Sequence, residues 1–85
     1  MEIILLPIAE KHLDFWKKTG NKKALKKISE LIKATLETPY DGIGKPEALK
    51  YQLTGKWSRR IDKENRFVYT ITDNKLYIYS LKGHY

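Results

Sequence analysis

Residues 66–72, with the sequence RFVYTIT, decide the fold. Aromatic and aliphatic side chains recur at every second position, which is the pattern of a β-strand with one buried face. Successive side chains of a strand point to opposite faces, so Phe67, Tyr69 and Ile71 share one face. We expect this face to lie on the core. Arg66 is then expected on the more open face, where a ligand has access.

Turn signals on both sides of this strand predict an antiparallel sheet. After it, Asp73-Asn74 is a two-residue turn that leads into a strand over residues 75–81. Before it, Lys63-Glu64-Asn65 is typical of a hairpin loop and follows a strand over residues 56–62.

Two further strands are predicted at the margins of the sheet. Residues 51–53 are expected to begin a strand, which the Thr54-Gly55 turn closes. Residues 2–6 form a short apolar run that ends at Pro7 and predicts a buried strand.

A pair of helices is predicted between residue 8 and residue 37. Residues 22–37 carry a continuous apolar stripe at helical spacing, and Thr38-Pro39 ends the helix, because a residue before proline avoids the helical region. Residues 8–19 show the same spacing, with His12 interpreted as a packed or half-exposed helix residue. Gly20-Asn21 supplies the end of one helix and the cap of the next. The sequence therefore predicts an α+β fold with an αα-hairpin laid across a sheet.

Composition limits the classes of function. The 85 residues make one expected domain, residues 1–85, with a net charge of +7. Most of that excess falls in residues 42–85, which hold nine bases and four acids. Such a basic chain suggests a polyanionic partner, above all nucleic acid, although a merely soluble basic surface is the alternative.

Other partners and compartments are not favoured. The chain has no cysteine, and its two histidines, His12 and His84, lie far apart in sequence, so we expect no metal site and no cofactor. No run approaches the length of a membrane span and no signal peptide is recognisable, so a cytoplasmic protein without membrane contact is expected.

The candidate site centres on residues 42–50, GIGKPEALK, within a loop punctuated by glycine and proline. Cleaving RNA without a metal needs a base for the 2′-hydroxyl, an acid for the departing 5′-oxygen and fixed donors for the phosphate. Glu47 is the candidate base, His84 the candidate acid and Arg66 the candidate phosphate donor, since guanidinium matches phosphate bidentately. Tyr85 is a candidate to stack on a nucleobase.

Three more cations are candidates for contact with RNA: Lys45, Lys50 and Arg59. Trp57 and Ile61 are expected to lean on the core, and the orientation of Arg59 is left open. On the residues alone, a surface glutamate and a frayed terminus explain the same pattern without any catalysis.

Four blocks of sequence together resemble one known family. These blocks are GIGKPEALK at residues 42–50, LTGKWSRRI at 53–61, NRFVY at 65–69 and the final His84-Tyr85. They resemble the YoeB/Txe toxins of the RelE superfamily, small bacterial toxins that cut messenger RNA in the ribosomal A site. The similarity extends over essentially the whole chain, with Asn65 in place of a frequent histidine as one departure.

The resemblance implies a fold, a site and partners. The fold is RelE-like, with two N-terminal helices on a twisted, mainly antiparallel sheet and the site on the opposite, concave face. Glu47 would match the general base, Arg66 the phosphate-stabilising arginine, His84 the general acid and Tyr85 the tyrosine that orients the substrate. Lys50 and Arg59 would match basic positions around that site.

The partners implied are a YefM-type antitoxin, the ribosome with its mRNA, and operator DNA reached through the antitoxin complex. The oligomeric state is left open, with a homodimer among the expectations. The alternative function is a non-catalytic module that binds RNA, the ribosome or an antitoxin and acts as a corepressor.

Overall fold

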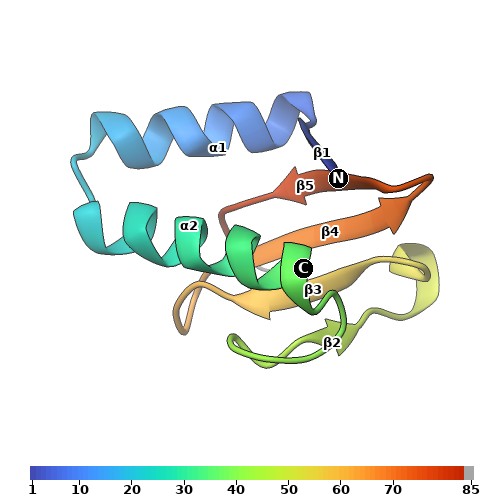
Figure 1. Cartoon of the computed structure of the whole chain (residues 1–85). Helices are drawn as coiled ribbons and strands as arrows, with labels where there is room; N and C mark the ends of the chain where they lie inside the picture. Colours follow the sequence, from blue (N-terminus) through green and yellow to red (C-terminus); the bar gives the residue numbers. More distant parts are fainter. Residues whose placement is uncertain (84–85) are drawn as a thin grey trace.

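The computed structural model of the chain describes residues 1–83. Its elements, in chain order, are β1 (Glu2–Leu5), α1 (Pro7–Lys18), α2 (Lys22–Glu37), β2 (Glu47–Ala48), the 3₁₀ helix η1 (Tyr51–Leu53), β3 (Trp57–Arg60), β4 (Arg66–Thr72) and β5 (Lys75–Ser80). The five strands form one sheet in the order β1-β5-β4-β3-β2, in which only the pair β1–β5 is parallel. Both helices lie against one face of this sheet (Figure 1), which confirms the predicted α+β architecture.

The two helices begin and end where their sequence signals lie. Pro7 occupies the first turn of α1, where its missing N–H costs nothing. The side chain of Asn21 caps α2 by accepting a hydrogen bond from the backbone N–H of Ala24 at 3.0 Å. The bounds of α2 are those predicted, and its buried residues are Ala24, Ile28, Leu31 and Thr35.

The predicted faces of β4 are confirmed. Phe67 and Tyr69 are completely buried and belong to the core cluster, with Ile71 packed against it. Arg66 lies half-exposed on the other face. That face is not fully open, because Val68 is buried as well and lines a small cavity with Leu53 and other residues.

Residues 51–53 do not form the predicted strand. Tyr51 adopts a positive φ of 58°, which turns the chain out of an extended course, and the segment closes into the 3₁₀ helix η1. The N–H of Leu49 bonds the carbonyl of Lys56 at 2.9 Å across the base of this excursion. The strand that does pair with β3 here is β2, Glu47–Ala48, which the sequence did not indicate.

The strand predicted over residues 56–62 is shorter, Trp57–Arg60. It stops because the N–H groups of both Ile61 and Asp62 turn to the carbonyl of Asn65 and close a tight loop. Among residues 1–83, no helix has both the length and the apolar character needed to cross a membrane.

Candidate active site

The register of the sheet brings three charged side chains to one face. Glu47 pairs with Ser58 across β2 and β3, and Arg60 pairs with Arg66 across β3 and β4. Residues paired in register share a face, as do residues two apart on one strand. Glu47, Arg60 and Arg66 therefore lie on the face of the sheet that the helices leave uncovered.

Glu47 is exposed and lines a cavity of about 430 Å³ formed by residues 47–53, together with Lys50. Lys45 is also exposed, at a positive φ of 51°, two residues before Glu47. Both lysines that flank Glu47 in sequence, Lys45 and Lys50, are therefore accessible to solvent.

Arg66 is bent toward the loop that precedes it. Its Nη1 donates to the carbonyls of Asp62 at 2.9 Å and Lys63 at 3.2 Å. Within residues 1–83, its side-chain hydrogen bonds all use Nη1, which leaves other guanidinium N–H groups for an anion.

The loop between β3 and β4 is organised by Asp62. Its Oδ1 accepts hydrogen bonds from the N–H groups of Glu64 and Asn65, both at 2.8 Å, and from the Asn65 amide. Partial burial alone would raise the pKa of Asp62, but these hydrogen bonds and the nearby Arg66 charge lower it below its usual value. Asp62 therefore stays ionised and fixes the side chain of Asn65.

Asn65 in turn holds Gly83, the last residue that the structure describes. Its Oδ1 accepts from the N–H of Gly83 at 2.7 Å, and the carbonyl of Gly83 accepts from the N–H of Arg66 at 3.0 Å. These two hydrogen bonds hold the backbone of Gly83 against the side chain of Asn65 and the backbone of Arg66. The predicted acid His84 and the predicted Tyr85 follow directly and lie outside the described residues.

Arg59, predicted to contact RNA, is not at the surface. Its side chain has no exposed area, and its guanidinium bonds the carbonyls of Thr38, Asp41 and Ile43. Direct contact between this guanidinium and RNA is therefore contradicted by its burial. The sequence held a signal for this, because Arg59 has the same strand parity as Trp57 and Ile61.

Arg60 is the basic residue that the sequence reasoning missed. It is exposed and is the cross-strand partner of Arg66. Strand parity could have found it, since Arg60 must face away from Arg59 and toward the open side.

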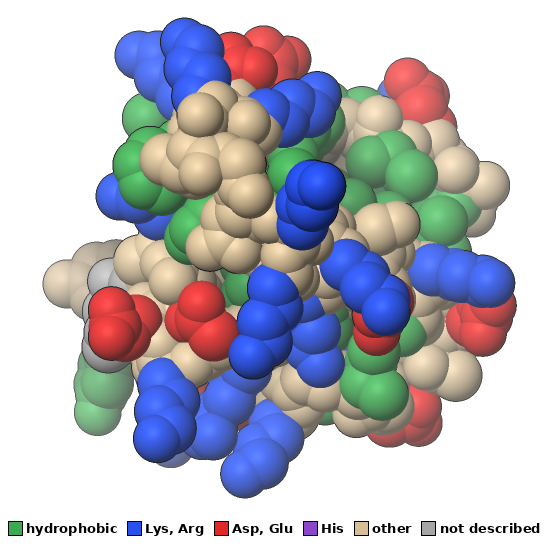
Figure 2. All heavy atoms as spheres, turned by 90° about the vertical axis from the view of Figure 1, so that its left-hand side faces the viewer, with side chains coloured by type: hydrophobic (Ala, Val, Ile, Leu, Met, Phe, Trp, Pro, Cys, Tyr) green, Lys and Arg blue, Asp and Glu red, His purple; other side chains and the backbone are tan. Residues whose placement is uncertain are grey.

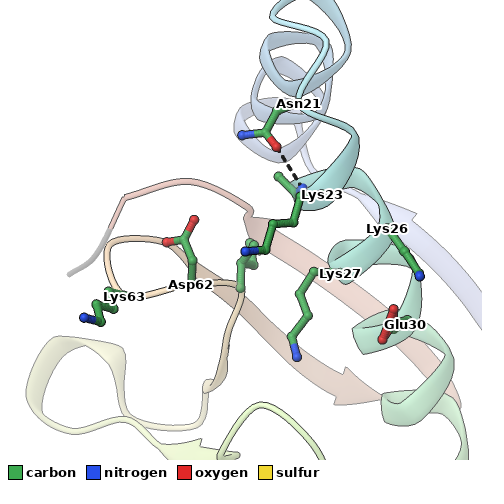
Figure 3. Close-up of a pocket in the computed structure, with 9 residues that line it drawn as sticks. Asn21, Lys23, Lys26, Lys27, Glu30, Asp62 and Lys63 are labelled. Atoms are coloured by element: carbon green, nitrogen blue, oxygen red, sulfur yellow. Dashed lines mark hydrogen bonds between the residues drawn. The ribbon is translucent and has the colours of Figure 1, made fainter.

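A second basic region lies at the N-terminal end of α2. Figure 2 shows lysine and arginine side chains gathered over this end of the molecule. A cavity of about 520 Å³ is lined there by Asn21, Lys23, Ala24, Lys26, Lys27, Glu30, Ile61, Asp62 and Lys63. In Figure 3, Lys23 extends from α2 toward the segment that carries Asp62 and Lys63, and Lys27 projects from the same helix.

His12 is a half-buried helix residue, as predicted, and it anchors the chain just before the site. Its Nδ1 accepts from the N–H of Leu81 at 3.0 Å, and the Ser80 hydroxyl lies 3.4 Å from the same atom. Burial, aided by the charge of Lys82, lowers the pKa of His12 below its usual value of 6.5.

Acid should therefore loosen this anchor. Because the pKa of His12 is lower in the folded chain than in the unfolded one, the stabilisation is complete above about pH 6.5 and is lost as the pH falls through the folded value. Protonated Nδ1 cannot accept from Leu81, and one neutral hydrogen bond is worth about 0.5–1.5 kcal/mol. We expect the free energy of unfolding, measured with urea, to fall between pH 7 and pH 5 more steeply for the natural chain than for His12→Gln. Equal slopes would contradict this role of His12.

Comparison with known proteins gives one family. The model of the YoeB-like toxin of bacterial type II toxin-antitoxin systems matches residues 8–85. The toxin YoeB of Synechocystis sp. is 54% identical over 74 residues, 87% of this chain and 86% of that protein. The toxin YoeB of Escherichia coli K12 is 52% identical over 71 residues, 84% of this chain and 83% of that protein.

Solved structures agree over the full length. The YoeB/ParE toxin from Agrobacterium tumefaciens has a TM-score of 0.96 at 36% identity and covers 100% of both chains. A chain of the YoeB-YefM complex from Staphylococcus aureus has a TM-score of 0.90 at 45% identity, covering 100% of this chain and 98% of that one. On this sequence and structural similarity, the chain belongs to the YoeB-like toxins of bacterial type II toxin-antitoxin systems.

Proposed function

We propose that the chain is a ribosome-dependent endoribonuclease that cuts mRNA without a metal. Glu47 takes the proton of a 2′-hydroxyl, and the 2′-oxygen attacks the adjacent phosphorus. The bond from phosphorus to the 5′-oxygen breaks, and His84 gives that oxygen its proton. The products are a 2′,3′-cyclic phosphate, or the 3′-phosphate formed from it, and a free 5′-hydroxyl.

One observation carries the proposal: the pairing of β2, β3 and β4 puts Glu47 and Arg66 on one face, and Gly83 is bonded to Arg66. Glu47, Arg66 and Gly83, the residue that precedes His84 in sequence, thus belong to one region of the sheet. Acid–base groups contribute about 10²- to 10⁴-fold each to such a reaction.

Each cationic residue around this site has its own role in the proposed reaction. Arg66 offers guanidinium N–H groups to the phosphate as negative charge grows in the transition state. Arg60, exposed beside it, takes the place that the sequence gave to Arg59. Lys45 and Lys50 contact the RNA backbone on either side of Glu47, and Tyr85 stacks on a nucleobase.

The protein partners follow from the related structures. A YoeB-YefM complex and a YoeB dimer from Staphylococcus aureus have chains of this fold at 45% and 44% identity. We therefore propose a YefM-type antitoxin as the partner, whose acidic segment covers the basic face, with a homodimer and operator DNA bound through the antitoxin complex as further assemblies.

Cleavage of mRNA on purified translating ribosomes tests the enzymatic function. The natural chain should produce fragments with 5′-hydroxyl ends, whereas the double variant Glu47→Ala, His84→Ala should give only the background of ribosomes alone. Equal cleavage by the two proteins would rule out this function.

A non-catalytic ribosome-binding module is the second candidate, because the basic cavity beside α2 lies outside the proposed site. In that case, inhibition of translation would follow the lysines of the cavity and the salt concentration. It would not depend on Glu47 or His84.

A further inference from the structure

We propose that Arg59 and Tyr69 are positioning residues for Glu47, an inference that rests on the proposed ribonuclease function. Neither side chain reaches the open face of the sheet, since both are completely buried. They act through the segment 38–44, the larger part of the connection between the end of α2 and the short strand β2 that carries Glu47.

The guanidinium of Arg59 is wrapped by this segment. Nη1 donates to the carbonyl of Ile43 at 2.9 Å, and Nη2 donates to the carbonyls of Thr38 and Asp41. Within residues 1–83, the oxygen atoms that these groups meet are neutral carbonyls and the hydroxyl of Tyr69. A buried charge is costly unless it is hydrogen-bonded, so guanidinium and loop stabilise one another.

Tyr69, on the neighbouring strand β4, also bonds this segment. We call the side chains of Arg59 and Tyr69 together the clamp. The hydroxyl of Tyr69 accepts from Nε of Arg59 at 3.4 Å and donates to the carbonyl of Pro39. Its ring stacks on Phe67 with centroids 4.9 Å apart, which fixes the direction of the hydroxyl. One hydroxyl thus links β4, Arg59 and the start of the segment.

The far end of the segment is fixed to the same strand as Arg59. The carbonyl of Gly44 accepts from the N–H of Arg60 at 2.7 Å. A Cβ at position 44 would lie 2.7 Å from Leu31 Cδ2 and 3.0 Å from Arg59 Cβ, so the backbone passes directly over the arginine stem. Only Lys45 and Pro46 separate this contact from Glu47.

The clamp therefore determines where the carboxylate stands relative to Arg60 and Arg66. Strand β2 has only two residues, too few ladder contacts to hold Glu47 by pairing alone. Misplacing a catalytic group by about 1 Å can cost about 100-fold in rate. Residues that touch no substrate can thus affect the chemical step through this segment.

Tyr69→Phe tests the clamp, because it removes the hydroxyl and keeps the ring. On programmed ribosomes we expect its kcat for mRNA cleavage to fall about 10- to 100-fold while KM for the ribosome stays unchanged. Amide hydrogen exchange of residues 41–44 should become faster than in the natural chain. The matched control is Ile28→Val, a core substitution on the helix side of the molecule, which should lower the melting temperature and leave both kcat and loop exchange unchanged.

The outcomes separate the two proposals. If the natural chain does not cleave mRNA, the proposed function fails and this inference fails with it. If the natural chain cleaves and Tyr69→Phe has the same kcat as Ile28→Val, only the positioning role is overturned. A higher KM for the ribosome with an unchanged kcat would also overturn the positioning role, because that result would place Tyr69 in ribosome binding.

Discussion

Replacing Glu47 with glutamine is expected to lower the rate of mRNA cleavage on the ribosome by about 10²- to 10⁴-fold. Glutamine keeps the length and shape of the side chain but cannot take the proton of the 2′-hydroxyl. The position is exposed and no described side-chain hydrogen bond depends on it, so the fold should be unchanged. Single-turnover cleavage with saturating protein measures the chemical step directly.

The matched control is Glu10→Gln, the same chemical change at an exposed position of α1. It should cleave at the natural rate. A Glu47→Gln protein that cleaves as fast as Glu10→Gln would exclude Glu47 as the base.

The course of the sheet could be predicted because local signals agree with the final contacts. Residues 66–72 alternate cleanly, and the turns on both sides set the antiparallel pairing that the structure shows. The joint resemblance of four blocks, residues 42–50, 53–61, 65–69 and 84–85, to the YoeB/Txe toxins added the family, which similarity over residues 8–85 confirms.

Two predictions from the sequence were wrong: the strand at residues 51–53 and the contact of Arg59 with RNA. Tyr51 takes a left-handed backbone conformation that a tyrosine rarely adopts, so no propensity could indicate the turn that replaces a strand. Arg59 looks like a surface cation, but carbonyls 16 to 21 residues away bond it in the interior. Arginine in a strand is interpreted by default as exposed. The parity of Arg59 with Trp57 and Ile61 pointed to the core face, and the partners of its guanidinium show how the buried charge is accommodated.

Placing Glu47 and Arg66 on one face also required register. The two residues lie on strands separated by β3, and a shift of one residue in either pairing would put them on opposite faces. The sequence predicted Arg66 on the open face but gave no strand for Glu47. Their common face is therefore a finding of the structure.

The second large effect is expected at the last two residues. Substituting His84→Ala and Tyr85→Ala together should lower the cleavage rate by about 10²- to 10⁴-fold through loss of the acid. Substitution is better than deletion, because a chain ending at Gly83 would put its terminal carboxylate beside the main chain of Arg66. Ribosome affinity, measured by sedimentation, should change little, since the exposed lysines and arginines of residues 1–83 remain.

The role of His84 as acid can be separated from a role in positioning by changing the leaving group. The substrate is an mRNA with sulfur in place of the 5′-oxygen at the scissile bond. Its leaving group departs as a thiolate, which needs no proton at the moment of cleavage. On this substrate the loss caused by His84→Ala should shrink to about tenfold or less, because the missing acid is no longer required. Glu47→Gln should stay as slow as on ordinary RNA, since the 2′-hydroxyl still has to lose its proton. If His84→Ala is equally impaired on both substrates, the imidazole does not donate the proton, and the acid must be another group.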